Sequence, residues 1–379
     1  MEQQIRILYI LAGPMSYGGT EAFIMNYYRN MNKQNVIVDF VYQGESDGVY
    51  DRELISNGSK IYHVINKNKN PFLFSKQIYC IIKENNYLII HSHMDAMSAW
   101  PLMIAKLAGA PIRIAHSHNT AHQTTNRVKI FINDFAKKIL RKVATHYYAC
   151  GIEAGKWMFG KKLYNQGKVK IIHNAIDLDK YSFSLDKRLR IREEFGIDEN
   201  EILVGHVGQF REQKNHIKLI QIFYELRSRN DKYKLLLVGS GSLEVKCKEL
   251  CSKLGVADSV VFAGDRDDVS DILNAIDLFL FPSLYEGLSF VAIEAQANGL
   301  PCVFSNTISY ETFLQENIEI IELNSDAEIW ADGVERVILM GRINGKEKLS
   351  DNGYNIKSEA KKLELSYVNM VKGEDYIND

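Results

Sequence analysis

The sequence predicts an α/β protein made of two domains that each contain a parallel sheet. Short runs that are nearly continuous in Val, Ile, Leu and Phe recur along the chain, and such runs are typical of strands buried on both faces of a parallel sheet. Helix-length amphipathic segments separate the runs and can serve as crossovers between parallel strands. At roughly 150 residues per domain, a chain of 379 residues is long enough for two such domains.

The expected strands fall into two series. The first series is expected at 5–12, 36–42, 60–65, 87–91, 112–115, 146–149 and 169–173. The second is expected at 202–207, 233–238, 259–263, 278–281 and 301–304. A charged stretch at 177–188 separates the series, so we expect a first domain over 1–180 and a second over 181–355. An amphipathic segment at 356–372 predicts a C-terminal helix that packs back on the first domain.

The composition excludes several classes of protein. Lys and Arg number 46 against 47 Asp and Glu, so the basic excess of a general nucleic-acid binder is missing. The five cysteines are scattered, and we expect reduced thiols in a cytosolic protein. No stretch reaches the ~18–20 apolar residues of a membrane span. Glu2 stands where a signal peptide would be positively charged, so we expect no signal peptide.

The first strand leads into a glycine turn that could bind an anion. Gly18 and Gly19 permit unusual backbone angles and the close approach of a ligand. Thr20 is placed to cap the following helix, whose free amides favour an anion. An ordinary strand-to-helix turn explains the same residues. A Walker loop is excluded because no Gly-Lys-Ser/Thr follows.

Histidines cluster at two expected strand ends. The segments are His91-Ser92-His93 and His116-Ser117-His118-Asn119. A single such histidine is usually a core or capping residue, but four at two strand ends favour a site in which a histidine hydrogen-bonds a substrate hydroxyl or phosphate. A zinc site with Asp95 and His122 as further ligands is the alternative interpretation.

Basic and glycine-rich loops follow two strands of the second domain. After Gly208, Arg211 and Lys214 stand where a phosphate would bind, although a solvated basic loop is the alternative. Gly239 and Gly241 follow the next strand. They do not form a dinucleotide fingerprint, because position 244 is a glutamate instead of the third glycine.

The segment 281–301 carries the most chemical information. A strand ends near Pro282, and a helix is expected from Ser289, its cap, to Asn298. The amides that begin this helix suit a pyrophosphate. Glu286 before the helix can face a sugar ring, while Glu294 inside it can reach a ribose diol, because carboxylates accept hydrogen bonds from vicinal hydroxyls. A turn residue and a solvated helix residue are the alternatives.

These motifs together resemble those of glycosyltransferase family 4. The E-x7-E spacing of Glu286 and Glu294 within PSLYEGLSFVAIEAQANGLP is similar to the signature of that family of retaining enzymes, which have the GT-B fold. The resemblance covers most of the chain and includes GGTE at 18–21, HSHN at 116–119, HNAID at 173–177, GQFREQKN at 208–215 and GSG at 239–241. The motifs are most similar to those of bacterial capsular and exopolysaccharide glycosyltransferases.

The resemblance implies two Rossmann-like domains facing across a cleft and a hexosyltransferase-type activity (EC 2.4). The first domain is then the acceptor side, and the second binds a nucleotide sugar, expected to be a UDP sugar. The acceptor is expected to be a glycan, lipid-linked, in capsular or exopolysaccharide biosynthesis. The enzyme is expected in the cytoplasm, with peripheral attachment to the inner face of the plasma membrane.

The resemblance also assigns roles to residues. His118 and Glu286 are the expected catalytic residues, with His118 near the reacting sugar and Glu286 on the transferred sugar. The expected donor-binding residues are Gly18, Gly19, Gly208, Arg211, Lys214, Gly239, Gly241, Arg266, Gly287, Leu288, Ser289, Phe290 and Glu294. One position departs from the family, which usually has Gly-Arg where this chain has Gly208-Gln209. Arg211 can supply the missing charge, or phosphate binding rests on Lys214 alone.

The expected chemistry needs no metal and no cofactor. Departure of the diphosphate builds negative charge that Lys214, Arg211 and the helix amides can stabilise. The Asp-x-Asp metal motif is matched only as a string by Asp265-Arg266-Asp267-Asp268. Carboxylates in the first turn of a helix interact favourably with the helix dipole, and this explains the acidic residues without a metal. No carboxylate stands out as a nucleophile, so retention by same-face attack is expected from the resemblance.

A basic amphipathic segment at 127–143 has two interpretations. Its apolar residues recur at helical spacing among six Lys and Arg residues. They are Val128, Phe131, Ile132, Phe135 and Ile139, and the basic residues are Arg127, Lys129, Lys137, Lys138, Arg141 and Lys142. Either the apolar face packs on the core, or the helix docks on an anionic membrane.

Two other functions fit the sequence. A sugar-nucleotide epimerase or hydrolase of the same fold would give free sugar or an epimer without an acceptor. A non-catalytic nucleotide-sugar-binding protein is consistent with Gln209 and would bind without turnover.

Overall fold

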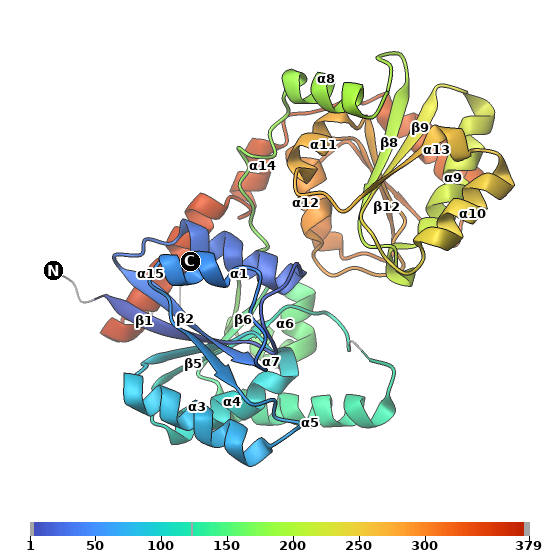
Figure 1. The fold of residues 1–379 in the computed structure, drawn as a ribbon. Coiled ribbons are helices and arrows are strands. Elements are labelled where there is room, and N and C mark those ends of the chain that lie inside the picture. Colours follow the sequence, from blue (N-terminus) through green and yellow to red (C-terminus); the bar gives the residue numbers. More distant parts are fainter. Residues whose placement is uncertain (1–3, 123, 375–379) are drawn as a thin grey trace. The chain divides into compact units, whose positions relative to one another are not determined.

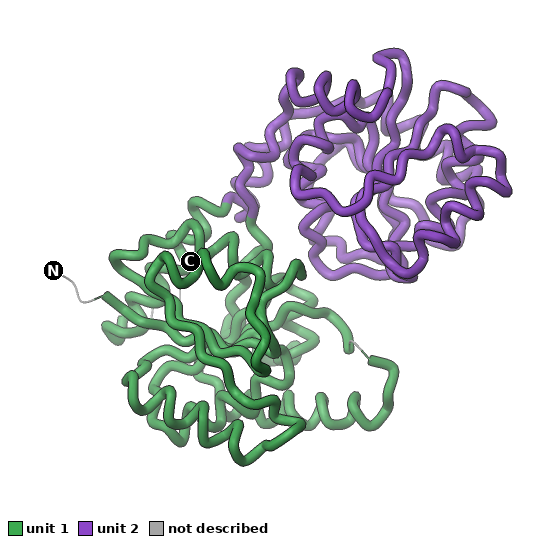
Figure 2. The backbone as a smooth tube through the Cα atoms, viewed as in Figure 1, with its two compact units in different colours: residues 1–175, 356–379 green, residues 176–355 purple. Residues whose placement is uncertain are grey.

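The computed structural model describes residues 4–122 and 124–374, and these residues form two compact units (Figure 2). Unit 1 contains the chain up to Ala175 together with the segment that begins at Ile356, and unit 2 contains Ile176–Asn355. Unit 2 therefore begins a few residues before the expected boundary. The reason is that Ile176 and Leu178 are buried in a core cluster of unit 2 with Leu288 and Ile293.

Unit 1 is built on a parallel sheet with helices on both faces (Figure 1). The strand order is β3-β2-β1-β4-β5-β6-β7. The strands are β1 (Ile5–Ile10), β2 (Val36–Gln43), β3 (Ile61–Val64), β4 (Ile89–Ser92), β5 (Ile112–Ser117), β6 (His146–Ala149) and β7 (Val169–Ile171). The helices are α1 (Gly19–Asn30), α2 (Asp51–Ser56), α3 (Pro71–Asn85), the 3-10 helix η1 (Asp95–Ser98), α4 (Ala99–Leu107), α5 (Arg127–Val143), α6 (Ile152–Phe159), α7 (Lys161–Asn165) and α15 (Ile356–Lys372).

Unit 2 repeats this architecture with the strand order β10-β9-β8-β11-β12-β13. The strands are β8 (Ile202–Val207), β9 (Tyr233–Val238), β10 (Val260–Gly264), β11 (Leu278–Phe281), β12 (Cys302–Ser305) and β13 (Ile318–Ile321). The helices are α8 (Leu185–Glu194), η2 (Glu212–Lys214), α9 (His216–Arg229), α10 (Glu244–Leu254), η3 (Ala257–Ser259), α11 (Val269–Ala275), α12 (Phe290–Ala297), η4 (Tyr310–Thr312), α13 (Ala327–Ile338) and α14 (Lys346–Asp351).

The structure confirms the predicted fold class of two parallel-sheet α/β domains. The predicted strands do not include β13, whose short run 318–321 is only partly buried because it lies at the edge of its sheet. Several strand ends also shift by one or two residues. For example, β4 begins at Ile89 and includes Ser92, whereas the expected strand covered 87–91.

The C-terminal helix α15 belongs to unit 1, where it packs on α1. Its Tyr367 is fully buried, and the Tyr367 hydroxyl lies 2.7 Å from the Tyr9 hydroxyl of β1. The same helix supplies Glu364, whose carboxylate accepts a hydrogen bond from the amide of Asn35 at 2.7 Å. These contacts attach the end of the chain to the first strand and its neighbours.

Among the described residues, no helix is both long enough and apolar enough to cross a bilayer.

Candidate active site

In each unit the strand order reverses at one point, and that point is where an open parallel sheet usually binds ligands. In unit 2 the reversal lies between β8 and β11, and in unit 1 it lies between β1 and β4. In each unit, the loops that leave the carboxyl ends of the two strands at this point are therefore candidates for ligand binding. The loops of each unit are described by themselves.

In unit 2 the loops after β8 and β11 are joined by hydrogen bonds. The amide of Leu284 donates to the carbonyl of Gln213 at 2.8 Å, and the Gln213 side chain donates to the carbonyl of Tyr285 at 2.9 Å. The Asn215 side chain donates to the carbonyl of Pro282 at 3.0 Å. These bonds hold the basic loop and the glutamate loop in one fixed arrangement.

Lys214 and Glu286 form an ion pair across the point where the strand order reverses. The Lys214 Nζ lies 2.8 Å from the Glu286 Oε1, and each side chain is only 10% exposed. The same ammonium lies 4.7 Å from the centre of the Phe281 ring at the end of β11. The structure thus brings together two residues that the sequence analysis selected separately, and it provides a cation and a carboxylate at one place.

The glycines of the β8 and β9 loops are required for close backbone packing. Gly239 has φ +128°, and a Cβ there would lie 2.4 Å from the carbonyl oxygen of Gly208. Gly241 has φ +155°, and its Cβ would lie 2.6 Å from the carbonyl oxygen of Phe210. Both positions combine a backbone conformation that favours glycine with a collision that a side chain would cause. These contacts fix the loop that carries Lys214.

Helix α12 begins close to Glu286, as predicted, but its cap differs from the expectation. Ser289 is the N-cap residue, as predicted, but its side chain makes no capping hydrogen bond. The position of the cap is therefore correct, and the predicted capping by the serine hydroxyl is wrong. Leu288 is buried in a core cluster of unit 2, so only its backbone could contact a ligand. The first-turn amides of α12, beginning at Phe290, have no intrahelical acceptor and give this end partial positive charge.

Glu294 has a partner that the sequence analysis missed. The Tyr181 hydroxyl donates to the Glu294 Oε1 at 2.7 Å, and burial raises the pKa of Glu294, an effect that the Tyr181 hydrogen bond opposes. Tyr181 lies in the charged stretch that was expected to separate the domains, and its spacing from Glu294 offered no sequence signal. The carboxylate is therefore held in one orientation instead of lying free in solvent.

The two candidate arginines of unit 2 have different surroundings. The exposed Arg211 forms no ion pair among the described residues, so its charge is available to a ligand. The Arg266 guanidinium contacts both oxygens of Asp268 and donates to Glu194 at 2.7 Å. Within the acidic cluster 265–268, Asp268 therefore pairs with Arg266 near the start of α11, and Asp265 accepts a hydrogen bond from the Ser240 hydroxyl at 2.6 Å.

In unit 1 the glycine turn after β1 differs from the prediction in its cap. Helix α1 begins at Gly19 with Gly18 as its N-cap, so Thr20 lies inside the first turn and the predicted threonine cap is wrong. A Cβ on Gly18 would lie 2.3 Å from a carboxylate oxygen of Glu21, which folds back over the turn. Burial raises the pKa of Glu21. The turn is thus shaped by an acid as well as by the free amides of α1.

The four clustered histidines form a stacked array at the ends of β4 and β5. These strands are neighbours, as expected, and residues two apart on a strand face the same side of the sheet. His91 hydrogen-bonds to His116 at 3.1 Å, and His93 hydrogen-bonds to His118 at 2.9 Å. The two pairs stack, with ring centres 4.2 Å apart for His91 and His93 and 4.3 Å apart for His116 and His118.

This array fits a hydrogen-bonded core better than a metal site. The ligand atoms of His91, His93 and His116 lie within 4.8 Å of one another, which is close enough for a shared ion. However, stacked rings direct their in-plane nitrogen lone pairs side by side and not toward one point. In addition, both ring nitrogens of His91 already have partners, His116 and the Tyr367 hydroxyl at 2.7 Å.

Burial keeps the array neutral at pH 7. It lowers the pKa of His118 to about 4, and nearby Asp95 only partly opposes this effect. Burial lowers the pKa of His91, His93 and His116 well below the ordinary value. A neutral His118 can exchange hydrogen bonds with a hydroxyl but carries no charge to attract a phosphate.

The basic amphipathic segment forms helix α5, and most of its apolar residues do not pack on the core. In α5 the side chains of Val128, Phe131, Ile132 and Phe135 are exposed, with Phe131 at 74% and Phe135 at 57%. The interpretation that this apolar face packs on the core is therefore wrong for these four residues, whereas Ile139 does pack against the core of unit 1. Lys137, in contrast, is buried over the Trp157 ring at 3.5 Å and pairs with Asp134, so it does not belong to the basic surface.

Comparisons with known proteins identify both units. The model described as "Glycosyltransferase Family 4" matches residues 17–180, and the model "Glycosyl transferases group 1" matches 187–356. A "Putative glycosyltransferase EpsF" of Bacillus subtilis is 32% identical over 98% of each chain. A "UDP-Gal:alpha-D-GlcNAc-diphosphoundecaprenol alpha-1,3-galactosyltransferase" of Escherichia coli is 27% identical over 78% of each chain. The "Capsular polysaccharide biosynthesis glycosyltransferase CapH" of Staphylococcus aureus is 24% identical over 93% of this chain and 94% of its own.

The fold is also that of a solved structure. The crystal structure of Anabaena Alr3699/HepE in complex with UDP superposes with a TM-score of 0.73 over 97% of this chain and 100% of that one, at 16% identity.

Proposed function

Because this chain belongs to the glycosyltransferases of family 4 and group 1, we propose that it moves a hexose from a UDP sugar to a lipid-linked glycan in capsular or exopolysaccharide biosynthesis. The observation that carries this proposal is the ion pair of Lys214 and Glu286 at the point where the strand order of unit 2 reverses. The names of two relatives support the nucleotide and the pathway, since one uses UDP-Gal and another acts in capsule synthesis.

In the proposed donor site, Lys214 exchanges partners when the donor binds. A diphosphate beside the Lys214 ammonium competes with Glu286 for that cation, which frees the Glu286 carboxylate for the hydroxyls of the transferred sugar. The α12 amides and Arg211 bind the remaining phosphate charge, and Glu294, held by Tyr181, accepts hydrogen bonds from the ribose diol.

The proposed reaction proceeds with retention and without a metal. The bond between the anomeric carbon and the diphosphate oxygen breaks, and the acceptor hydroxyl oxygen attacks the same face of that carbon. The hydroxyl proton passes to the departing diphosphate oxygen, and Lys214 with the helix amides stabilises the negative charge that develops there. His118, neutral at pH 7, is proposed to hydrogen-bond a hydroxyl of the reacting sugar.

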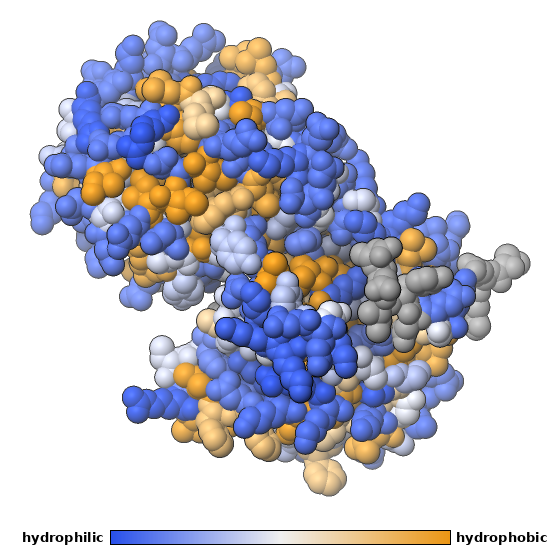
Figure 3. Space-filling view, turned by 180° about the vertical axis from the view of Figure 1, so that it is seen from behind, coloured by the Kyte–Doolittle hydropathy of each residue, from blue (hydrophilic) through white to orange (hydrophobic). Residues whose placement is uncertain are grey.

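We also propose that α5 docks the protein on an anionic membrane that holds the acceptor. Hydrophobic side chains reach the surface of both units in the view of Figure 3, so exposure alone does not mark a binding surface. The exposed stripe of α5 is distinguished by its cationic border of Arg127, Lys129, Lys138, Arg141 and Lys142. The expected result is sedimentation with vesicles containing phosphatidylglycerol but not with neutral phosphatidylcholine vesicles. Equal partitioning to both would contradict an electrostatic contribution.

A thermal-shift panel tests the donor assignment. A ligand that binds only the folded state raises the Tm by mass action, so the true donor should stabilise the wild type and leave Glu294→Ala unchanged. UDP sugars should give the largest shift, and activity should persist in EDTA. A larger shift with GDP sugars would contradict the UDP assignment, and loss of turnover in EDTA would contradict the metal-free mechanism.

A further inference from the structure

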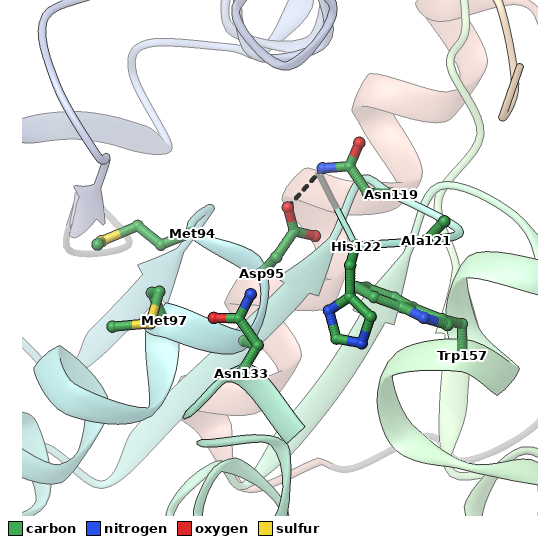
Figure 4. Close-up of a pocket in the computed structure, with 9 residues that line it drawn as sticks. Met94, Asp95, Met97, Asn119, Ala121, His122, Asn133 and Trp157 are labelled. Atoms are coloured by element: carbon green, nitrogen blue, oxygen red, sulfur yellow. Dashed lines mark hydrogen bonds between the residues drawn. The ribbon is translucent and has the colours of Figure 1, made fainter. Parts of the chain in front are cut away.

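Unit 1 contains a pocket beside the histidine array that the proposed roles do not use. It lies between the segment after β4, the loop after β5 and the two helices α5 and α6 (Figure 4). The lining residues are Met94, Asp95, Ala96, Met97, Asn119, Ala121, His122, Asn133 and Trp157. In Figure 4 the two methionines lie on one side, His122 and Trp157 lie on the other, and Asp95 and Asn133 lie between them.

The pocket offers hydrogen-bonding groups that have no partner among the described residues. The Nδ1 of His122 is buried without a hydrogen bond, although its Nε2 lies 3.2 Å from a carboxylate oxygen of Asp134. The side chain of Asn133 makes no hydrogen bond with any described residue. The Asn119 amide nitrogen donates to Asp95 at 2.6 Å, which leaves its oxygen available. These groups can accept and donate, as a set of ligand hydroxyls requires.

The net charge around the pocket opposes a phosphate ligand. Asp95 pairs with no cation among the described residues. Its carboxylate accepts only neutral donors, the Asn119 amide and the backbone amide of His118 at 2.9 Å. Lys137, the nearby cation, is occupied by Asp134 and by the face of Trp157. Asp95 and Asp134 thus share this one cation, and the group keeps a net negative charge. That charge opposes a phosphate, whereas a carboxylate accepts hydrogen bonds from sugar hydroxyls, and the methionines and Trp157 suit the apolar face of a sugar ring.

We propose that this pocket binds an uncharged sugar ring at the end of the acceptor, so that the enzyme extends a glycan and does not glycosylate a bare lipid phosphate. Two structural links support this assignment. Asp95 connects the pocket to His118 through the His118 backbone amide. Asn133 belongs to α5, the helix whose other face carries the exposed apolar stripe. The inference rests on the proposed function, and it requires an earlier glycosyl transfer to supply the acceptor.

The test compares soluble acceptors in the wild type and in variants that remove the hydrogen-bonding amide of Asn133 from the pocket. The acceptors are a panel of neutral octyl glycosides and octyl phosphate, and the variants are Asn133→Leu, the milder Asn133→Ser and the control Asn68→Leu on an exposed turn. We expect transfer to a glycoside and not to octyl phosphate. We also expect Asn133→Leu to raise the acceptor KM at least 10-fold, and Asn133→Ser to raise it less. The donor KM, and the slow release of UDP without acceptor, should stay unchanged in both.

Three results would overturn the pocket assignment: faster transfer to octyl phosphate than to any glycoside, an unchanged acceptor KM in both Asn133 variants, or UDP release with no transfer to any glycoside. If Asn133→Leu fails to fold, Asn133→Ser decides the question by the same criterion. Failure of the proposed function is distinguishable, because the wild type would then consume none of the nucleotide sugars.

Discussion

The two units share one strand order, yet they place opposite kinds of chemistry where that order reverses. Unit 2 places a charged pair there, Lys214 with Glu286, on loops that hydrogen bonds fix in place. Unit 1 places four histidines near the end of β4, and burial keeps them neutral. The same topology therefore provides a charged pair in one unit, which we propose binds a diphosphate, and neutral side chains in the other, which we propose bind hydroxyls.

The difference shows how burial decides the function of a polar residue. Lys214 is buried but keeps a carboxylate at 2.8 Å, so its charge is compensated. Among the described residues, the histidine rings of unit 1 hydrogen-bond one another and a tyrosine. Asp95 near His118 only partly opposes burial, so the neutral form is favoured. Fold alone does not predict this division. It depends on which residue each strand end offers as a partner.

The largest expected effect comes from removing the cation of unit 2. Lys214→Met should lower kcat/KM by roughly 10²–10³-fold, because it removes a charge that stabilises the departing diphosphate. It should also lower the Tm, because Glu286 is left buried without its partner. Both are measured by UDP release and by thermal denaturation.

The double variant Lys214→Met/Glu286→Gln separates the two effects. It should recover the Tm, since neither charge remains, while activity stays low. Recovery of activity in the double variant would show that Lys214 serves only to neutralise Glu286.

The second prediction concerns acid stability and unit 1. In the unfolded chain histidines take up protons near pH 6.5, whereas folded His118 stays neutral down to about pH 4. The unfolded state therefore binds more protons between these values, and the free energy of unfolding falls as the pH falls through this window. With four such histidines, unit 1 should lose stability first, and the Tm should fall on the order of 10 °C.

Hydrogen exchange resolved by peptide can locate this loss. Peptides from β4 and β5 should lose protection at a higher pH than peptides from β8 and β11, where His206 and His216 are the buried histidines. His116→Gln removes one titrating ring and should make the Tm less sensitive to acid. Earlier loss of protection in unit 2 would contradict the prediction.

Much of the fold and part of the site could be predicted from the sequence. Parallel strands such as β8 and β9 are short, nearly continuous apolar runs and could be predicted as buried strands, whereas the edge strand β13 is only partly buried and is interrupted by Glu319. Gly239 and Gly241 are expected donor-binding residues, and the structure adds that they allow two backbone segments to pack closely. This close packing could not be predicted from the sequence, because the sequence does not show which loop lies opposite the two glycines.

Partners distant in the sequence account for most of what the sequence analysis missed. Tyr181 and Glu294 meet only because the segment that opens unit 2 folds against α12. The fourfold stacking of histidines needs the registers of both β4 and β5. The exposure of Phe131 and Phe135 could not be predicted, because an amphipathic pattern does not say which face meets the core.

A third, smaller effect tests whether Tyr181 positions Glu294. Glu294→Gln should raise the donor KM by about 10- to 100-fold, since a hydrogen bond to a charged group contributes ~1.5–3 kcal/mol. Tyr181→Phe keeps the carboxylate but removes its orienting hydroxyl, so it should raise the donor KM by less and leave kcat nearly unchanged. An equal loss in kcat for both variants would place Glu294 in the chemical step and not in ribose binding.

The smallest expected effect addresses the missing arginine at Gln209. Arg211 is exposed and free of ion pairs among the described residues, whereas Arg266 is bound by Asp268 and Glu194. If Arg211 supplies the second phosphate-binding charge, Arg211→Gln should lower kcat/KM by about 10-fold, in line with the loss of one charge-assisted hydrogen bond. Arg266→Gln should change it by less. Adding Gln209→Arg to Arg211→Gln should restore activity, because one cation in this loop replaces the other.

If the double variant stays as slow as Arg211→Gln, the position of the charge matters and not merely its presence. If Arg211→Gln is as active as the wild type, Lys214 alone serves as the side-chain cation for the diphosphate.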